Sequence, residues 1–354
     1  MKRSDWTDPL QAANVSRQWG RRGEKLPKAI HMPLRLLLVM TLAPLVALVA
    51  GGCGTDATIR VPGLSAGAGR TLVASGTTGV LVRSGDGGQS WAPVTSAVAG
   101  TLDDVGQDGS GHWLSMGIGG ICTISNDDAL SWGSCAGTPA SVFALARDNT
   151  NRWVAVGAGG MVAYSTDGGV TWTIGASGTG SAINGVATDN AGNWVAVGNV
   201  GTVIWSIDGG ANWTAGFAGT ASTLSGVTYD GSGRFIAVGQ SGTAIWSIDG
   251  GNTWTLGTTG TAASLNDVQA DGTGFTLAVG TGGTAIFSPD GGANWNSGVT
   301  GTASTLYDQI NVGGTAWYAV GQAGTVLHSV DNGANWAALS AVTGADLWSV
   351  AAGP

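Results

Sequence analysis

One octapeptide with the pattern Ser-X-Asp-Gly-Gly-X-X-Trp recurs along the chain, and residues 206–213 are a representative copy. Successive copies place their aspartates 41, 40, 41, 41, 41 and 41 residues apart. A fixed period indicates a repeat architecture, and about 40 residues suits one four-stranded propeller blade. In the degraded copy at 125–132, Asp128 and Ala129 replace the two glycines. The aspartate and tryptophan of the seven copies are Asp86 and Trp91, Asp127 and Trp132, Asp167 and Trp172, Asp208 and Trp213, Asp249 and Trp254, Asp290 and Trp295, and Asp331 and Trp336.

Each repeat contains short β-rich runs separated by clusters of Asp, Gly and Ser. In one repeat we expect strands at 224–229, 235–238, 243–247 and 253–256, joined by turns. Copies of the second run are almost continuously apolar, as in strands buried on both faces. The sequence therefore predicts an all-β fold, a seven-bladed β-propeller of four-stranded antiparallel blades with the octapeptide turning between the third and fourth strands.

Two segments could supply the first strand of the first blade. Residues 61–66 and 347–352 both match the apolar positions of that strand. Pro62 weakens the N-terminal candidate, because proline cannot donate to a sheet ladder. We favour closure of the ring by the C-terminal strand.

The octapeptide resembles the Asp-box, also called the BNR repeat, which occurs in sialidases, sortilin-like receptors, some endoglucanases and photosystem II assembly-factor-like propellers. In these families the motif is structural. The chemistry agrees, because Asp accepts hydrogen bonds from turn N–H groups, Gly adopts positive φ and Trp covers the turn. We expect no metal at these aspartates, since no oxygen-ligand loop of calcium spacing accompanies them. The regular repeat most closely resembles the photosystem II assembly/stability factor-like group, which implies a propeller that holds membrane-protein assembly intermediates.

The first 60 residues differ in composition from the rest. Residues 1–31 are polar and basic, and 36–49 form an apolar run that is short for a membrane span. The run ends in Leu-Val-Ala-Gly-Gly-Cys at Cys53, which resembles a bacterial lipobox and implies lipidation of Cys53. We assign 1–52 to an N-terminal extension and lipoprotein signal peptide, 53–60 to a tether and 61–354 to the propeller. Met32 is an alternative start, and a secreted protein or an uncleaved anchor are the alternatives to lipidation.

Composition excludes several functions. From Cys53 onward the chain has 19 Asp and 6 Arg but neither Lys nor Glu, so it cannot neutralise a nucleic acid backbone. The glutamate and arginine motifs that a sialidase needs are missing, and His112 and His328 have no nearby cysteines for zinc. No serine-nucleophile elbow is present. We expect no enzyme activity, no catalytic residues and no cofactor. An Asp-dependent glycosidase stays open as an alternative, because aspartates could form its carboxylate pair.

The repeats differ most informatively early in the first strand of each blade, which lines the channel of a propeller. Aspartates occur there in blades six, seven and two, which lie on one side of the ring. Clustered carboxylates raise one another's pKa or hold a cation, so we treat this region as a candidate binding site, with solvated channel lining as the alternative. The candidate residues are Asp103, Asp104, Asp267, Asp308, Tyr307 and Gln309.

Two cysteines flank the degraded box. If Ser125 pairs with Trp132, then Cys122 and Cys135 lie directly opposite each other on adjacent strands. In an exported protein such a pair is expected to form a disulfide, which would compensate for the lost glycines. The residues just before the boxes include Tyr164, Trp205 and Trp246, and these aromatics either pack between blades or form a sugar platform.

The sequence thus favours a non-enzymatic, lipid-anchored propeller that acts as a protein-binding or assembly scaffold. The basic patch of the photosystem group is not evident, which leaves a general scaffold role. We expect a monomer with a protein partner in the cell envelope, at the outer membrane or cell surface and on its periplasmic or extracellular side. The alternative class is a cell-surface carbohydrate-binding protein or glycosidase.

Overall fold

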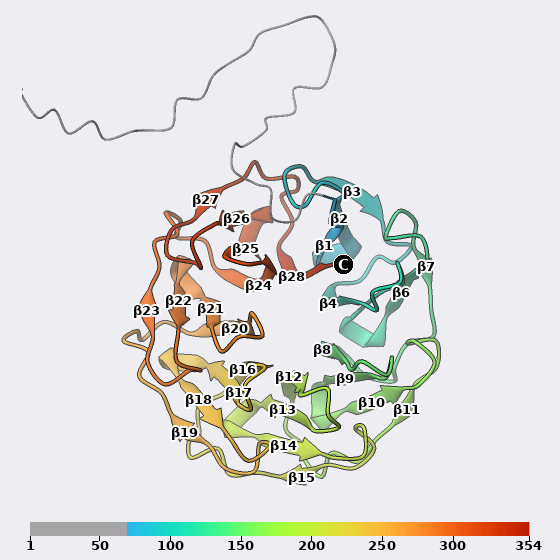
Figure 1. Cartoon of the computed structure of the whole chain (residues 1–354). Helices are drawn as coiled ribbons and strands as arrows, with labels where there is room; N and C mark the ends of the chain where they lie inside the picture. The colour runs from blue at the N-terminus through green and yellow to red at the C-terminus, as the bar shows by residue number, and fades with distance from the viewer. Residues whose placement is uncertain (1–68, 354) are drawn as a thin grey trace, which may run out of the picture. The chain divides into compact units, whose positions relative to one another are not determined.

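The computed structural model describes residues 69–353, which form a ring of seven four-stranded antiparallel sheets around a central channel (Figure 1). Each sheet is one blade. We number the blades along the ring, and blade one has the strand order β28-β1-β2-β3. The fold is therefore the predicted seven-bladed propeller.

The innermost strand of each blade lines the channel. These strands are β28 (Leu347–Ala352), β4 (Leu102–Gln107), β8 (Val142–Arg147), β12 (Ile183–Thr188), β16 (Leu224–Tyr229), β20 (Leu265–Ala270) and β24 (Leu306–Gly313). The second strands are β1 (Leu72–Gly76), β5 (Trp113–Gly117), β9 (Trp153–Gly157), β13 (Trp194–Gly198), β17 (Phe235–Gly239), β21 (Thr276–Gly280) and β25 (Ala316–Gly321).

The third and fourth strands form the outer part of each blade. The third strands are β2 (Val80–Ser84), β6 (Cys122–Ser125), β10 (Val162–Ser165), β14 (Val203–Ser206), β18 (Ala244–Ser247), β22 (Ala285–Ser288) and β26 (Val326–Ser329). The fourth are β3 (Ala92–Thr95), β7 (Gly133–Ser134), β11 (Thr173–Ile174), β15 (Thr214–Ala215), β19 (Thr255–Leu256), β23 (Asn296–Ser297) and β27 (Ala337–Ala338). One-turn 3₁₀ helices join the second and third strands, and they are η1 (Thr77–Gly79), η2 (Ile118–Gly120), η3 (Ala158–Gly160), η4 (Asn199–Gly201), η5 (Gln240–Gly242), η6 (Thr281–Gly283) and η7 (Gln322–Gly324).

The apolar second strands hold neighbouring blades together. All five residues of β17 are buried. Phe235 and Ala237 pack into the core shared with blade four, whereas Ile236 and Val238 pack into the core shared with blade six. Burying one such large side chain contributes roughly 1.5–3 kcal/mol. Alternation within a continuous apolar run therefore serves both interfaces of a blade.

The outer strands are shorter than the sequence predicts. The fourth strand of blade five covers only Thr255–Leu256, not 253–256. Thr253 instead forms a parallel bridge to Phe217 of blade four. The start of the predicted strand is thus used to join two blades, a contact that a pattern within one repeat does not contain.

The C-terminal strand closes the ring, as the sequence favours. β28 pairs with β1 in antiparallel register, with Leu72 opposite Ala352 and Ala74 opposite Val350. The Tyr318 hydroxyl of blade seven also donates a hydrogen bond of 2.9 Å to the carbonyl of Gly87 in blade one. The chain ends are therefore joined to the ring by pairing and by a buried side-chain contact.

Several sequence assignments concern residues outside the described range. These are the signal segment, the lipidated Cys53, the tether, the alternative strand at 61–66 and the predicted start of the propeller at residue 61. Within residues 69–353, no helix is long and apolar enough to cross a membrane.

Candidate binding site in the central channel

The Asp-box residues form a closed hydrogen-bond network within each turn. In blade four, Asp208 accepts the Ser206 hydroxyl at 2.8 Å, the Asn212 N–H at 3.0 Å and the Asn212 side-chain amide at 2.9 Å. The Trp213 indole donates to the carbonyl of Gly210 at 2.9 Å. These contacts use the carboxylate within its own turn, which is the structural role expected from the motif.

Ionised box carboxylates are stabilised by these donors. The Ser131 hydroxyl, followed by the Ser131 N–H, lowers the pKa of Asp127 to about 2. The Thr171 hydroxyl and N–H have the same effect on the pKa of Asp167. The aspartates are therefore charged at neutral pH but already supplied with donors.

The second glycine of each box lies against the preceding blade. Gly251 has φ 93°, and a Cβ there would lie 2.7 Å from the Val195 side chain of blade four. A side chain at this position would be strained by the positive φ and would force the Val195 side chain to move. The place of this glycine in the motif thus depends on packing between blades as well as on the turn.

Blade two keeps its turn without the glycines. Asp128 and Ala129 have φ values of 60° and 61°. Arg83 of blade one forms an ion pair with Asp128 at 2.8 Å and donates through Nε to the Asp128 carbonyl at 2.8 Å. Thr71 also donates to the Asp128 carboxylate. An ion pair across the blade interface therefore holds a turn that lacks its usual residues.

The structure has the disulfide that the cysteine spacing predicts. Cys122 and Cys135 are bonded, with Cα atoms 5.1 Å apart. Their neighbours Thr123 and Ser134 pair directly between β6 and β7, which confirms the predicted register. The disulfide joins the two strands that enter and leave the altered box.

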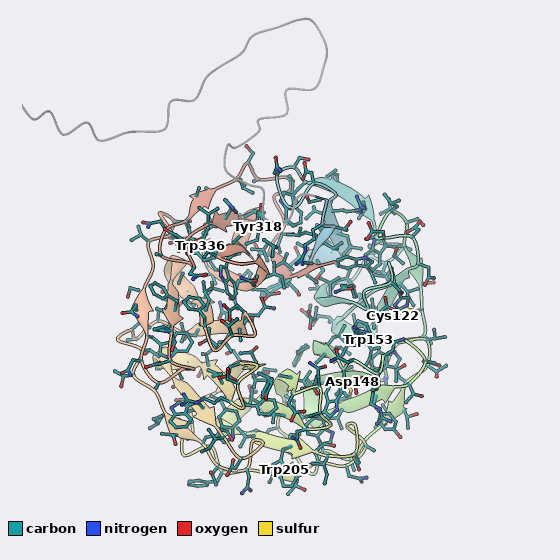
Figure 2. All side chains as sticks on the ribbon, in the orientation of Figure 1. Cys122, Asp148, Trp153, Trp205, Tyr318 and Trp336 are labelled. Atoms are coloured by element: carbon teal, nitrogen blue, oxygen red, sulfur yellow. A yellow bond between two sulfur atoms is a disulfide. The ribbon has the colours of Figure 1, made fainter. Side chains whose placement is uncertain are left out.

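The aromatic residues that precede the boxes pack against neighbouring groups. The Arg152 guanidinium lies 5.6 Å from the Tyr164 ring centre, and that of Arg234 lies 4.6 Å from the Trp246 ring centre. Trp205 packs against the core between blades four and five, and Figure 2 places it towards the outside of the ring. Tyr164, Trp205 and Trp246 are not among the residues that line the channel.

The central channel has a volume of about 890 Å³ and is lined by the inner strands. Of the described residues that line it, six are Asp and one is Arg. Arg147, Asp189 and Asp271 lie at the end near the Asp-box turns, because they close or follow their strands. The opposite end, which we call the entry mouth, is lined by the second residue of each inner strand, namely Trp348, Asp103, Phe143, Asn184, Ser225, Asn266 and Tyr307.

One residue further along the inner strands, aspartates join adjacent blades. Asp104 accepts the N–H of Leu145 in blade three at 2.6 Å, and Asp308 accepts the N–H of Val350 in blade one at 2.8 Å. The other oxygen of each carboxyl accepts the next N–H of its own strand, at 2.7 and 2.6 Å. Ser349 occupies this position in blade one and donates to Asp104 at 2.7 Å. Burial raises the pKa of Asp104 to about 7.

Asp267 has the same position in blade six, but a side-chain amide and not a backbone N–H joins it to the next blade. The Gln309 amide donates to Asp267 at 2.8 Å, and Gln309 is only 1% exposed. The two carboxyls of Asp267 and Asp308 act on each other's pKa, because they lie in adjacent blades of the same channel wall. Burial, followed by the charge of Asp308, raises the pKa of Asp267 well above its usual range. The predicted Asp104, Asp267 and Asp308 therefore lie along the channel wall, where they bridge blades six, seven, one, two and three. Gln309 does not line the channel, so its predicted place at the mouth is wrong, and it supports Asp267 from a buried position.

The other blades approach each other more closely at the same position. Gly185 and Gly226 occupy it in blades four and five, and a Cβ on Gly185 would lie 3.2 Å from the Gly226 Cα. A larger residue would require these two strands to move apart. The ring thus has a close-packed side with small residues and a side bridged by carboxyls.

Asp103 and Tyr307 lie at the entry mouth, with different surroundings. Tyr307 stacks on Trp348 with ring centres 4.1 Å apart and planes 28° apart. Asp103 Oδ2 and the Trp348 indole nitrogen are buried, and neither atom has a hydrogen-bond partner among the described residues. Burial raises the pKa of Asp103 to about 7. This mouth therefore carries an aromatic pair and a carboxyl that no structural contact explains.

Sequence reasoning missed Trp348 and Phe143 as mouth residues. Trp348 belongs to the C-terminal strand, so its place beside Tyr307 follows only once that strand closes blade one. Aligning 347–352 with the other inner strands would have given Trp348 the same position in its repeat as Asp103 and Tyr307 have in theirs. No group of three His, Cys, Asp or Glu side chains within residues 69–353 is arranged to hold a metal ion.

Comparison with known proteins supports the class that the geometry defines, a seven-bladed propeller with Asp-box repeats. The family model described as BNR/Asp-box repeat matches residues 163–173, within blade three. A search of curated proteins finds no match to the chain.

Among solved structures, the similar proteins include two of YCF48. YCF48 bound to a D1 peptide has a TM-score of 0.56 and 18% identity, and the match covers 76% of this chain and 84% of that chain. YCF48 from Cyanidioschyzon merolae has a TM-score of 0.57 and 18% identity, with 72% and 89% covered. The WD40 repeats of RRP9 give a TM-score of 0.59 at 8% identity, with 76% and 85% covered. At these identities the matches show a shared fold.

Proposed function

We propose that this propeller is a non-enzymatic scaffold that binds a protein partner outside the cytoplasm. The observation that carries the proposal is the entry mouth, where a stacked aromatic pair and an unpartnered carboxyl line one end of a channel of about 890 Å³. Aromatic side chains at the rim of a concave surface are typical anchors in protein recognition. YCF48, which is similar in fold, has been solved with a bound D1 peptide, and this supports the choice of a polypeptide ligand.

The bridging carboxyls argue against hydrolytic chemistry. An inverting or retaining glycosidase needs two carboxyls that are free to meet the substrate. Asp104 and Asp308 are instead occupied by N–H groups of their own and neighbouring strands. The contacts of these carboxyls stabilise the ring, so we propose no catalytic role for them.

A carbohydrate ligand is the second candidate, because the Tyr307–Trp348 pair offers an aromatic surface. Sugar recognition also needs free polar groups around that surface. The amides of Asn184 and Asn266 donate to the carbonyls of Leu224 and Leu306 at 2.8 and 2.7 Å. Since these groups are already used, we favour a protein ligand.

We further propose that the protein is exported and lipid-anchored through Cys53, which lies outside the described residues. The support is the apolar run that ends in the lipobox-like sequence before Cys53. Metabolic labelling with a fatty acid should mark the wild-type protein and not the C53A variant. Equal labelling of both proteins would exclude this anchor.

The scaffold proposal is tested by crosslinking the native protein in its membrane and identifying attached proteins by mass spectrometry. We expect one envelope protein to be enriched, with crosslinks that map to the entry mouth. Release of sugars or retention on a glycan array, without an enriched protein, would favour the carbohydrate candidate and overturn the scaffold.

A further inference from the structure

We propose that the entry mouth binds a cationic side chain, Lys or Arg, presented by a segment of the protein partner. This inference rests on the proposed scaffold function and specifies the chemistry of its ligand. It combines three separate features: an unsatisfied carboxyl oxygen, an aromatic pair and a mouth with neither Lys nor Arg among its described lining residues.

The first feature is the carboxyl of Asp103. Its Oδ2 atom is buried without a hydrogen-bond partner among the described residues, whereas Asp104 next to it is fully used by neighbouring N–H groups. Leaving a buried polar atom unpaired costs free energy, and rotation of the carboxyl towards a cation in the mouth would remove that cost. The raised pKa of Asp103, caused by burial, is the expected property of a carboxyl that lacks its positive partner.

The second feature is the aromatic pair beside it. Trp348 stands in blade one and Asp103 in blade two, at the same position of neighbouring inner strands. Tyr307 covers the Trp348 ring from blade seven. Cations are attracted to aromatic faces, most strongly to Trp, and the attraction increases when water is excluded. A carboxyl at the position next to Trp348 in the ring suits an ammonium or guanidinium group better than a neutral ligand.

The third feature is the charge of the surroundings. The channel wall carries Asp104, Asp267 and Asp308 below the mouth, and Asp346 lies close enough to Tyr307 to raise the pKa of its hydroxyl further, after burial. Arg147, the arginine among the described lining residues, lies at the opposite end of the channel. Burial raises the pKa of the three wall carboxyls, so they are partly protonated near neutral pH, and a cation at the mouth would favour their ionised forms.

An organic cation fits this mouth better than a metal ion. Metal ions such as calcium need six to eight oxygen ligands. Within the described residues no three potential ligands converge. One free carboxyl and two aromatic rings match a single side-chain cation on a longer segment, and the channel leaves room for that segment.

The test uses full-length protein labelled with 5-fluorotryptophan, and fluorine NMR reports on Trp348. The chain has 16 tryptophans, so the W348F variant identifies the Trp348 signal. The probe is the tripeptide acetyl-Gly-Lys-Gly-amide, and the matched neutral probe contains norleucine in place of lysine. We expect the lysine peptide to shift the Trp348 signal and the norleucine peptide to leave it unchanged.

Variants separate the local carboxyl from overall charge. D103N should weaken binding of the lysine peptide by about tenfold or more. D271N removes the same charge at the opposite end of the channel, where Asp271 accepts bonds from Thr273, and should bind like wild type. A thermal melt shows that both variants are folded. Equal binding by D103N and wild type, or an equal response to norleucine or to chitotriose, would overturn the inference.

Failure of this inference and failure of the scaffold proposal give different results. If the crosslinked envelope protein is retained by D103N, the scaffold stands and the cation site is wrong. If no protein is crosslinked but the lysine peptide binds as expected, the cation site stands and the scaffold is wrong.

Discussion

Because the C-terminal strand closes the ring, we predict that Leu347 contributes far more to folding stability than a residue near a chain end usually does. Leu347 is 0% exposed and packs in a core with Leu72, Val320 and Val350. A buried Leu→Ala substitution costs about 2–5 kcal/mol. For a body of about 300 residues, the unfolding entropy is about 0.6 kcal/mol/K, so each kcal/mol lowers the Tm by about 1.6 °C. L347A should therefore melt about 3–8 °C below wild type.

The measurement is a reversible thermal melt followed by near-ultraviolet circular dichroism. L256A is the matched control, since Leu256 lies on an outer strand and is 62% exposed. Its expected cost is within about 0.5 kcal/mol, which is less than about 1 °C. Equal melting of L347A and L256A would refute closure by β28. In that case V61A, in the alternative strand, should be the destabilising variant.

Three further predictions concern the disulfide of blade two and the contacts between blades. The Cys122–Cys135 disulfide has a sequence separation of 13, and a loop of this length gives it about 3 kcal/mol of folding stability. The double C122S/C135S variant should therefore melt about 5 °C lower than wild type, and an unchanged Tm would contradict this. G251A should destabilise by about 1–3 kcal/mol more than G250A in urea unfolding, because both have positive φ but only a Cβ at 251 would meet the preceding blade; equal losses would rule out that contact. Burial raises the pKa of Asp104 to about 7, so the folded protein keeps a proton that the unfolded chain loses near pH 4. The wild-type protein therefore loses stability through this group as the pH rises from about 4 to 7. Over this range the free energy of unfolding of D104N, minus that of wild type, should rise by at most about 1.4 kcal/mol per pH unit. A difference that does not depend on pH would exclude this titration.

The fold could be predicted from the sequence because the pattern of turn and strand residues that specifies one blade occurs seven times. The Asp-box turn, the inner strand at Leu224–Tyr229 and the register of Cys122 with Cys135 follow from contacts within one repeat. Local patterns and spacing contain such contacts. The number of blades follows directly from the number of boxes.

Contacts between blades could not be predicted in the same way. Arg152 donates to the carbonyl of Asp208, which is 56 residues away and in the next blade. The hydrogen bond from Leu145 to Asp104 likewise depends on how closely two inner strands approach. These distances are set by the size of the ring, which no pattern within a repeat determines. The sequence therefore identified the carboxyls at the channel but not what they bind there.

Repetition also separates structural residues from the remaining candidates. All seven copies of a position face nearly the same backbone, so a residue that differs among copies is not required by the blade itself. Asp104 and Asp308 depart from the small residues of blades four and five, and their bonds to adjacent strands account for the departure. Asp103 and Trp348 also depart, yet each keeps a buried polar atom without a partner among the described residues. The stack on Tyr307 accounts for Trp348 in part, whereas no contact accounts for the Asp103 carboxyl, which a ligand at the entry mouth would explain.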